Sequence, residues 1–190
     1  MTDPAGDGPA PVTDPASDGP GPVTDAASRD RDPGGRARNA RPRDELGRPL
    51  PRSAASDVPR VPDDLVIGPD EAAELGGRLL DDGRPFHAHE VFEAAWKSEP
   101  GPGRELWRGL AQIAVGLTHA RRGNAPGAVS LLRRGAAQVG AFADQPGKPG
   151  EPGPVDAGFV AGQASALAQL IERDGLAAVP GDALRLQLRP

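Results

Sequence analysis

Between residues 65 and 175, apolar side chains recur at intervals of three and four residues, and no stretch alternates strictly between apolar and polar positions. This periodicity predicts amphipathic helices and argues against strands. Five helices in one short region, joined by short connections, predict an all-α fold: a small bundle of about five helices with antiparallel neighbours. The expected helices are 69–82, 85–98, 104–122, 125–142 and 157–174.

The helix limits are marked by residues with known end preferences. Pro69 suits the first position of a helix, and the acids that follow it suit the positive end of the helix dipole. The run Pro100-Gly-Pro-Gly103 breaks the chain between two helices. Gly123 supplies a C-terminal turn and Asn124 the next N-cap, so we expect the third and fourth helices to be joined by a tight turn.

The third predicted helix is apolar around most of its circumference, with a seam formed by Leu106, Leu110, Ile113 and Leu117. A helix of this kind is typical of the centre of a bundle. Gln112 and His119 interrupt it seven residues apart on one face, and Arg108 precedes Gln112 by one turn. Buried polar groups need hydrogen-bond partners, which we expect on the neighbouring helix.

The second predicted helix supplies those partners. On a helical wheel His89 and Glu93 lie together at the edge of the apolar arc, beside Trp96, and Glu90 lies on the next row. His87 is placed on the far side, nearer solvent. The sequence therefore predicts a polar cluster between two helices, together with packing residues around it and a turn below it. The cluster is His89, Glu90, Glu93, Arg108, Gln112 and His119; the packing residues are Phe92, Trp96 and Trp107; the turn is Gly123 and Asn124.

Three interpretations of this cluster remain open. In the first, the cluster is a structural network that fixes helix register, and the same module could also bind a partner or ligand. In the second, His89, Glu93 and His119 form a divalent-metal site, in a metal-binding protein or a metal-dependent hydrolase. In the third, the site is metal-free, with Glu90 or Glu93 as base and His119 as acid. The first is favoured. Glu93 stands where a zincin motif needs its second histidine, and the sequence has no phosphate-binding loop and no nucleophile motif, so no catalytic residue or cofactor is assigned.

The rest of the chain divides by composition. Residues 1–35 repeat an eleven-residue Pro/Gly/Asp unit, from Thr2 to Val12 and again from Thr13 to Val23, and are expected to form a disordered acidic tail. Residues 36–64 form an Arg/Pro-rich extended arm, with Leu46, Leu50 and Val58 as weak anchors. The helical domain is 65–175, and 176–190 is expected to be a loose C-terminal tail.

Charge and residue usage limit the partners. The net charge is −5 and the chain has no cysteine, which excludes disulfides and thiolate sites. The arginine-rich stretch has prolines and no interleaved aromatic residues, so we do not expect nucleic-acid binding. No apolar run has the roughly 20 residues that span a bilayer, and no secretory signal follows Met1, so a cytoplasmic protein without membrane contact is expected. A homo-oligomer through the Ala-rich fifth helix (Ala161, Ala164, Leu167, Ala168, Leu170, Ile171) is an open alternative.

The two central helices also carry a family resemblance. HAHEVFEAAWK and ELWRGLAQIAVGLTHARRGNAPGAVSLLRRG resemble the domain-of-unknown-function family 309 (DUF 309), over about Leu79 to Phe142. The resemblance implies an all-helical fold and carries no activity. The segment RARNARPRDELGRPLPR resembles the N-terminal extension of actinobacterial members.

Overall fold

Helices form where the periodicity predicts them. The computed structural model describes residues 42–51, 53–54, 61–62, 65–143 and 155–190. The chain divides into two units, Met1–Ala40 and Arg41–Pro190, and every described residue belongs to the second. Its elements are α1 (Pro69–Asp81), α2 (Pro85–Ser98), α3 (Arg104–Arg121), α4 (Ala125–Gly140), α5 (Ala157–Asp174) and the short 3-10 turns η2 (Leu176–Ala178) and η3 (Asp182–Leu184). The all-α prediction is confirmed, while the predicted tail 1–35 lies outside the described residues.

The helix ends follow the local chemistry. Asn124 accepts a hydrogen bond from Gly127 N at the start of α4, and Asp156 accepts one from Phe159 N at the start of α5. These caps satisfy backbone donors that the first helical turn leaves free. Gly83 takes the left-handed backbone conformation, at φ 71°, in the turn between α1 and α2, which an L side chain rarely adopts.

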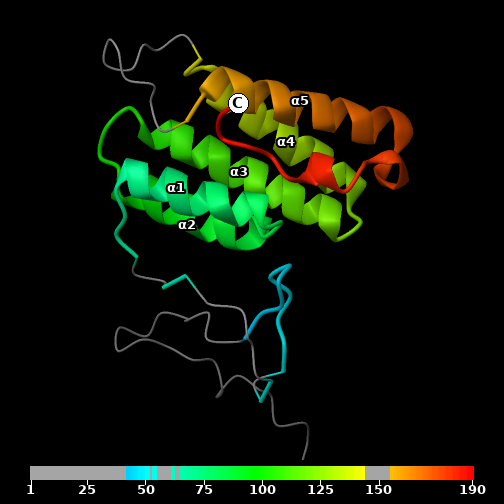
Figure 1. Ribbon diagram of the computed structural model, residues 1–190, viewed down its shortest axis with the longest axis horizontal. Helices are drawn as coiled ribbons and strands as arrows, with labels where there is room; N and C mark the ends of the chain where they lie inside the picture. Colours follow the sequence, from blue (N-terminus) through cyan, green and yellow to red (C-terminus); the bar gives the residue numbers. More distant parts are fainter. Residues whose placement is uncertain (1–41, 52, 55–60, 63–64, 144–154) are drawn as a thin grey trace, which may run out of the picture. The chain divides into compact units, whose positions relative to one another are not determined.

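Figure 1 shows α3 in the middle of the bundle, with α1 and α2 below it and α4 and α5 above it. Glycines allow the close approach of α3 and α4: a Cβ on Gly109 would lie 2.7 Å from Val139 Cγ2, and one on Gly116 would lie 3.0 Å from Leu132 Cγ. Ten residues of α3 are buried, which confirms that it is the central helix.

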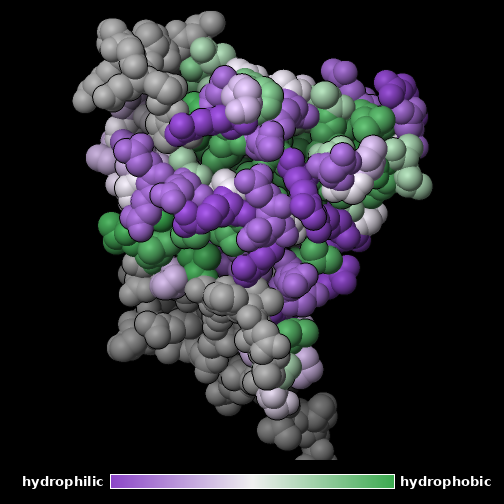
Figure 2. Space-filling view, viewed as in Figure 1, coloured by the Kyte–Doolittle hydropathy of each residue, from purple (hydrophilic) through white to green (hydrophobic). Residues whose placement is uncertain are grey.

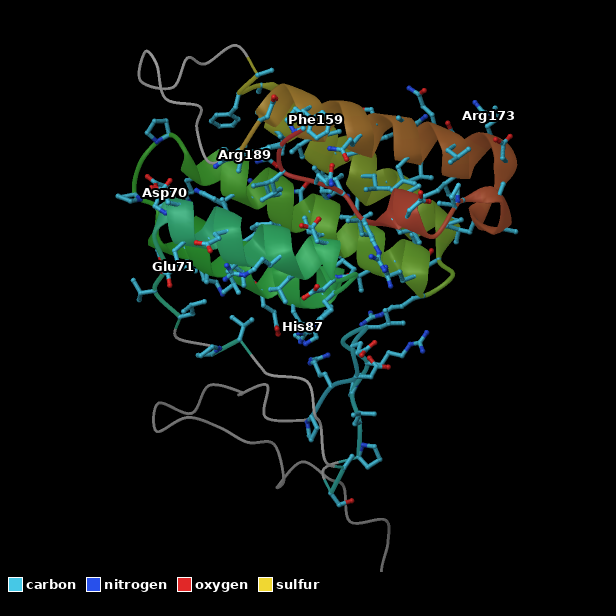
Figure 3. The ribbon with its side chains drawn as sticks, viewed as in Figure 1. Asp70, Glu71, His87, Phe159, Arg173 and Arg189 are labelled. Atoms are coloured by element: carbon cyan, nitrogen blue, oxygen red, sulfur yellow. The ribbon has the colours of Figure 1, made fainter. Side chains whose placement is uncertain are left out.

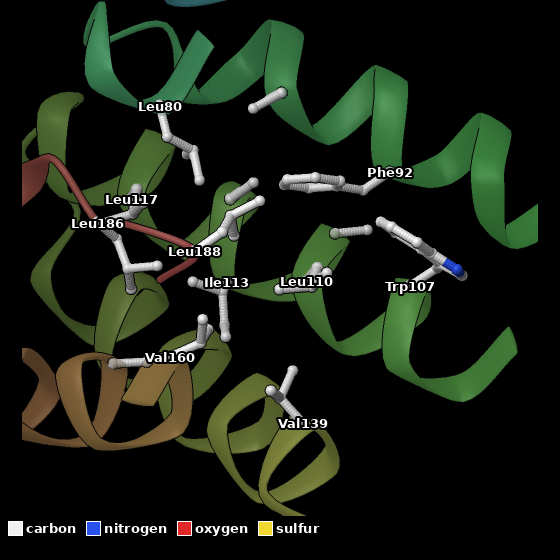
Figure 4. Close-up of a cluster of buried hydrophobic side chains, with 14 of the residues drawn as sticks. Leu80, Phe92, Trp107, Leu110, Ile113, Leu117, Val139, Val160, Leu186 and Leu188 are labelled. Carbon is white, nitrogen blue, oxygen red and sulfur yellow. The ribbon is translucent and has the colours of Figure 1, made fainter. Parts of the chain in front are cut away.

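The core is built largely from aliphatic side chains with one aromatic pair (Figure 4). Phe92 of α2 and Trp107 of α3 are both nearly inaccessible, and their ring centroids lie 6.1 Å apart. Phe92 also reaches α1, because a Cβ on Gly76 would overlap its ring. One phenylalanine thus packs against two neighbouring helices, and both aromatic side chains belong to the core that supports the predicted cluster.

The C-terminal tail is not loose, so that prediction is wrong. Leu186 and Leu188 are 2% and 7% exposed and enter the core beside Leu117 and Val160 (Figure 4). Backbone bonds hold the segment, since Asp156 N donates to Leu188 O at 2.9 Å. Leu186 and Leu188 alternate with exposed residues. The apolar surface that these two leucines bury stabilises the docked segment.

The fifth helix is also packed inward. Its apolar row is part of the core, with Ala164, Leu167, Ala168 and Ile171 all buried. These four residues are therefore not an exposed face, because α5 packs against α4. The expected homo-oligomer stays a prediction. The surface shown in Figure 2 is mainly hydrophilic. Within the described ranges, no helix has the length and apolar character needed to cross a membrane.

Part of the predicted arm is ordered as a loop. Residues 42–50, which we call the arm loop, close through an antiparallel bridge between Arg43 and Pro49 and a hydrogen bond from Leu50 N to Pro42 O at 2.8 Å. The loop contacts the bundle where α2 begins and α3 ends, through Phe86 and Arg122. The predicted anchor Val58 lies outside the described residues.

Candidate functional site on helices α2 and α3

Two half-buried rows of side chains mark the candidate site. On α2 the row is Phe86, His89, Glu93 and Trp96, and on α3 it is Gln112, Val115 and His119. Members of each row are spaced by three, four or seven residues, so each row lies on one side of its helix. We call the two rows together the α2–α3 face.

Contacts at both ends show that the rows belong to adjacent helices. At one end the Arg104 guanidinium of α3 lies 4.9 Å from the centre of the Trp96 ring of α2. At the other end the arm loop contacts both Phe86 of α2 and Arg122, which directly follows α3. The helices are therefore antiparallel neighbours, as their short connection predicts.

His89 is the most buried titratable group on this face. Its Nε2 lies 3.5 Å from Glu93 Oε2, one turn along α2, and Glu93 also pairs with Lys97 at 2.9 Å. Burial lowers the pKa of His89; the nearby Glu93 carboxylate opposes this effect and Lys97 adds to it. The imidazole is therefore favoured in its neutral form, and the tautomer with its proton on Nε2, facing the carboxylate, leaves Nδ1 as an acceptor.

Three polar atoms on the face are buried without a hydrogen-bond partner. They are His89 Nδ1, Trp96 Nε1 and Gln112 Oε1, in the part of the chain that the structure describes. The great majority of buried polar atoms in proteins are hydrogen-bonded, so such a group calls for a specific explanation. These atoms lie on the two helices that the sequence singled out, and Trp96 was expected there only as a packing residue.

Within the part of the chain that the structure describes, His119 and Arg108 of the predicted network do not pair with α2. His119 Nδ1 lies 2.7 Å from Asn124 Nδ2 in the α3–α4 turn, and Arg108 pairs with Glu105 of its own helix at 3.3 Å. Gln112 Oε1 and His89 Nδ1, which were expected to find partners across the interface, have none. Glu93, Arg108 and His119 find these partners within five residues along the sequence.

The three-ligand metal set is also not assembled. Among the described residues, no group of three or more His, Asp or Glu side chains is placed to hold a metal ion. His89 and Glu93 lie together, whereas His119 is engaged at the α3–α4 turn with Asn124. Glu90 is half-buried on α2, and its role as a base with His119 as acid stays a prediction.

Comparison with known proteins covers these same helices. Residues 74–131 match the sequence model of the family described as Domain of unknown function (DUF309). We call residues 74–131 the DUF309 segment, because they are similar to this family. Over 48 residues the chain is 44% identical to the Uncharacterized protein YpuF of Bacillus subtilis (strain 168). The aligned stretch covers 25% of this chain and 28% of that protein, and no solved structure matches the chain.

The DUF309 segment contains the whole α2–α3 face and the α3–α4 turn, and it ends within α4. The arm loop and the C-terminal leucines lie outside it. The bundle is thus completed by parts of the chain beyond the matched segment, because Leu186 and Leu188 fill its core.

His87 corrects the helical wheel. It was placed near solvent, yet it is only 3% exposed, and Figure 3 shows it at the edge of the bundle toward the arm loop. Burial lowers the pKa of His87 to about 4, with a further decrease from Arg84 and an opposing increase from Asp44 of the arm loop. The helical wheel describes α2 alone and does not include the arm loop. Asp44 of this loop lies close enough to His87 to oppose the decrease in its pKa.

Proposed function

We propose that the DUF309 segment is a binding module that holds a polypeptide segment along the α2–α3 face. The observation that supports this function is the group of three buried polar atoms without partners: His89 Nδ1, Trp96 Nε1 and Gln112 Oε1. In a purely structural network the polar groups hydrogen-bond to one another, whereas these three atoms have no hydrogen-bond partner among the described residues. Leaving a buried polar group without a partner costs about 1–3 kcal/mol, which a ligand that completes the hydrogen bonds returns.

The atoms define the chemistry of the ligand. Trp96 Nε1–H is a donor only, and Gln112 Oε1 is an acceptor, so the ligand must both accept and donate. The amide groups of a polypeptide do both at regular intervals. The Arg104 guanidinium against the Trp96 ring holds the indole in one orientation, which reduces the ordering that binding would otherwise require.

A metal-binding function has less support. His89 and Glu93 offer two ligands from one helix, whereas structural and catalytic zinc sites take three or four from the protein. No third His, Asp or Glu joins them in the described residues.

The test uses Gln112→Met in the full chain, because methionine is similar in length and removes the unpartnered oxygen. If Gln112 serves binding alone, Q112M leaves the melting temperature unchanged or raises it, since an apolar group replaces an unsatisfied one. The matched control is Gln138→Met on α4, whose amide donates to Glu105.

Binding is measured with a displayed library of random twelve-residue peptides selected on the wild-type chain. We expect enriched peptides to bind Q112M and H89A at least tenfold more weakly than wild type, and to bind Q138M as well as wild type. Failure to enrich any peptide, or equal binding to all variants, would refute the proposed function. A stability loss in Q112M as large as its binding loss would assign Gln112 a structural role instead.

A further inference from the structure

The arm loop has a shape that its own bonds define. Asp44 Oδ1 accepts hydrogen bonds from Leu46 N at 3.0 Å and from Arg48 N at 2.7 Å, and Asp44 N donates to Arg48 O at 3.0 Å. Arg43 Nη1 donates to Gly47 O at 2.6 Å across the same loop. These bonds lie within nine residues and need nothing from the bundle. The loop is therefore a preorganised turn that docks as a unit.

The bundle contacts this turn through the Phe86 ring and the Arg122 guanidinium. Gly47 has a φ of 73°, and a Cβ at this residue would lie 2.1 Å from Phe86 Cδ2, so the loop backbone rests on the ring. The Arg43 guanidinium lies 5.4 Å from the centre of the same ring. Arg122 Nε donates to Leu46 O at 2.9 Å, and Arg122 Nη2 donates to the same oxygen. The contacts recognise a glycine and a main-chain carbonyl, which are features of a turn rather than of one sequence.

One carboxylate of the arm loop lies near a cation of the receiving surface. Burial and the nearby Arg185 lower the pKa of Arg121, and Glu45 of the loop lies close enough to oppose this decrease. The receiving surface carries Arg84, Arg121 and Arg122. Among the described residues, His87 Nδ1, Arg84 Nη2 and Arg121 Nε are buried there without hydrogen-bond partners. Carboxylates are natural partners for guanidinium groups, so the surface suits a turn that carries a carboxylate.

The docked turn is held weakly enough to exchange. Gly47 is the one buried residue between 42 and 50, and Leu46 and Leu50 are only half-buried. Its hydrogen bonds to the bundle come from Arg122, which is itself exposed, and such exposed contacts contribute little net stability. A loop tethered to its own binding surface has an effective concentration on the order of millimolar, which keeps it bound without strong contacts.

We propose that Phe86, His87, Arg121 and Arg122 form a docking site for a carboxylate-bearing turn of a partner protein, and that the arm loop occupies this site within the chain until the partner replaces it. The partner's turn presents a carbonyl to Arg122, a glycine to Phe86 and a carboxylate toward Arg121. This inference shares Phe86 with the α2–α3 face but does not rest on the proposed function, because it uses neither His89, Trp96 nor Gln112.

The experiment separates the loop from its site in the full-length chain. Gly47→Val places a branched side chain against the Phe86 ring and at a positive φ, so it lifts the loop while leaving the helices unchanged. The probe is a fluorescein-labelled synthetic peptide of residues 42–50, and binding is followed by fluorescence polarisation. We expect the peptide to bind the G47V chain at least tenfold more tightly than the wild-type chain, whose own loop competes.

Four further variants make the result specific. Adding Arg122→Gln to the G47V chain should weaken peptide binding at least tenfold, whereas adding Arg134→Gln, on the exposed side of α4, should leave it unchanged. A peptide that carries the Gly47→Val change itself should not bind. Asp44→Ala, which opens the loop by removing its internal acceptor, should expose the site in the same way as G47V and serves if G47V folds poorly.

Absence of peptide binding to both opened chains would overturn the proposal, because the loop would then not be a ligand of this surface. Equal binding to the opened and wild-type chains would also overturn it, since the site would not be occupied in cis. Equal weakening by R122Q and R134Q would reduce the contact to general charge attraction and would overturn it as well. None of these outcomes bears on the peptide selection that tests the α2–α3 face.

Discussion

Acidification should destabilise this bundle through His87. The imidazole is 3% exposed, and burial lowers its pKa from 6.5 to about 4, with help from the Arg84 charge and against the pull of Asp44. The folded chain therefore resists protonation of His87, whereas the unfolded chain binds the proton with its ordinary pKa. Stability is fully present above pH 6.5 and falls as the pH drops from 6.5 toward 4.

The size of the effect follows from the two pKa values. A difference of 6.5 against about 4, at 1.36 kcal/mol per pH unit, limits the loss at low pH to about 3 kcal/mol. The same values give a loss of about 2.5 kcal/mol at pH 4.5 and almost none at pH 7.5. A small domain is stable by only about 5–15 kcal/mol, so the change is easily measured.

The assay is urea unfolding of wild type and His87→Gln at pH 7.5 and pH 4.5. Carboxylates titrate in the same range, so the informative quantity is the difference between the two proteins. We expect wild type to lose about 2 kcal/mol more than H87Q between the two pH values. An equal loss in both proteins would refute the burial argument, as would an NMR titration in which the His87 ring titrates near pH 6.5.

The remaining predictions concern packing and capping, each measured by urea or thermal unfolding. Gly76→Ala should destabilise the chain by about 1–3 kcal/mol, because its Cβ would overlap the Phe92 ring, whereas Gly162→Ala, which meets nothing within 4 Å on α5, should stabilise it by up to about 1 kcal/mol. Equal effects of these two variants would contradict the packing of Phe92 against α1. Asn124→Ala removes both the N-cap of α4 and the contact with His119 and should cost about 1–2 kcal/mol, while Asn124→Asp, which keeps the capping oxygen, should cost less. Leu188→Ala should cost about 2–5 kcal/mol as a core residue, and a change below about 0.5 kcal/mol would mean that the C-terminal segment does not stay docked.

The helices could be predicted from sequence because their signals are local. Periodicity located all five, and capping residues such as Asn124 and Asp156 placed the starts of α4 and α5. The central position of α3 was predictable for the same reason, since a helix that is apolar nearly all round has no other place in a bundle. The end of α4 was less well defined: the helix closes at Gly140 and turns continue to Ala143.

The sequence predicted where the candidate site lies but not which hydrogen bonds its side chains form. The wheel placed His89 and Glu93 correctly as a pair at the edge of the apolar arc, and it drew attention to Gln112. It then assumed that buried polar atoms find partners inside the chain, a rule that holds for most proteins. Gln112 Oε1 and His89 Nδ1 depart from that rule. Such departures are typical of functional sites, and only the three-dimensional structure reveals them.

His87 and the C-terminal leucines were misjudged for one common reason. Each is buried beside a segment far away in the sequence: His87 near the arm loop, and Leu186 and Leu188 among the helices of the bundle. A helical wheel describes the helix on which a residue lies, but not what covers that helix. The arm loop has few apolar side chains, and its docking depends on a glycine, a main-chain carbonyl and charges, none of which produces a hydrophobic pattern. A segment that docks through its backbone therefore leaves no hydrophobic periodicity in the sequence. Docking through the backbone is also what would allow another turn of similar chemistry to take its place, as we propose.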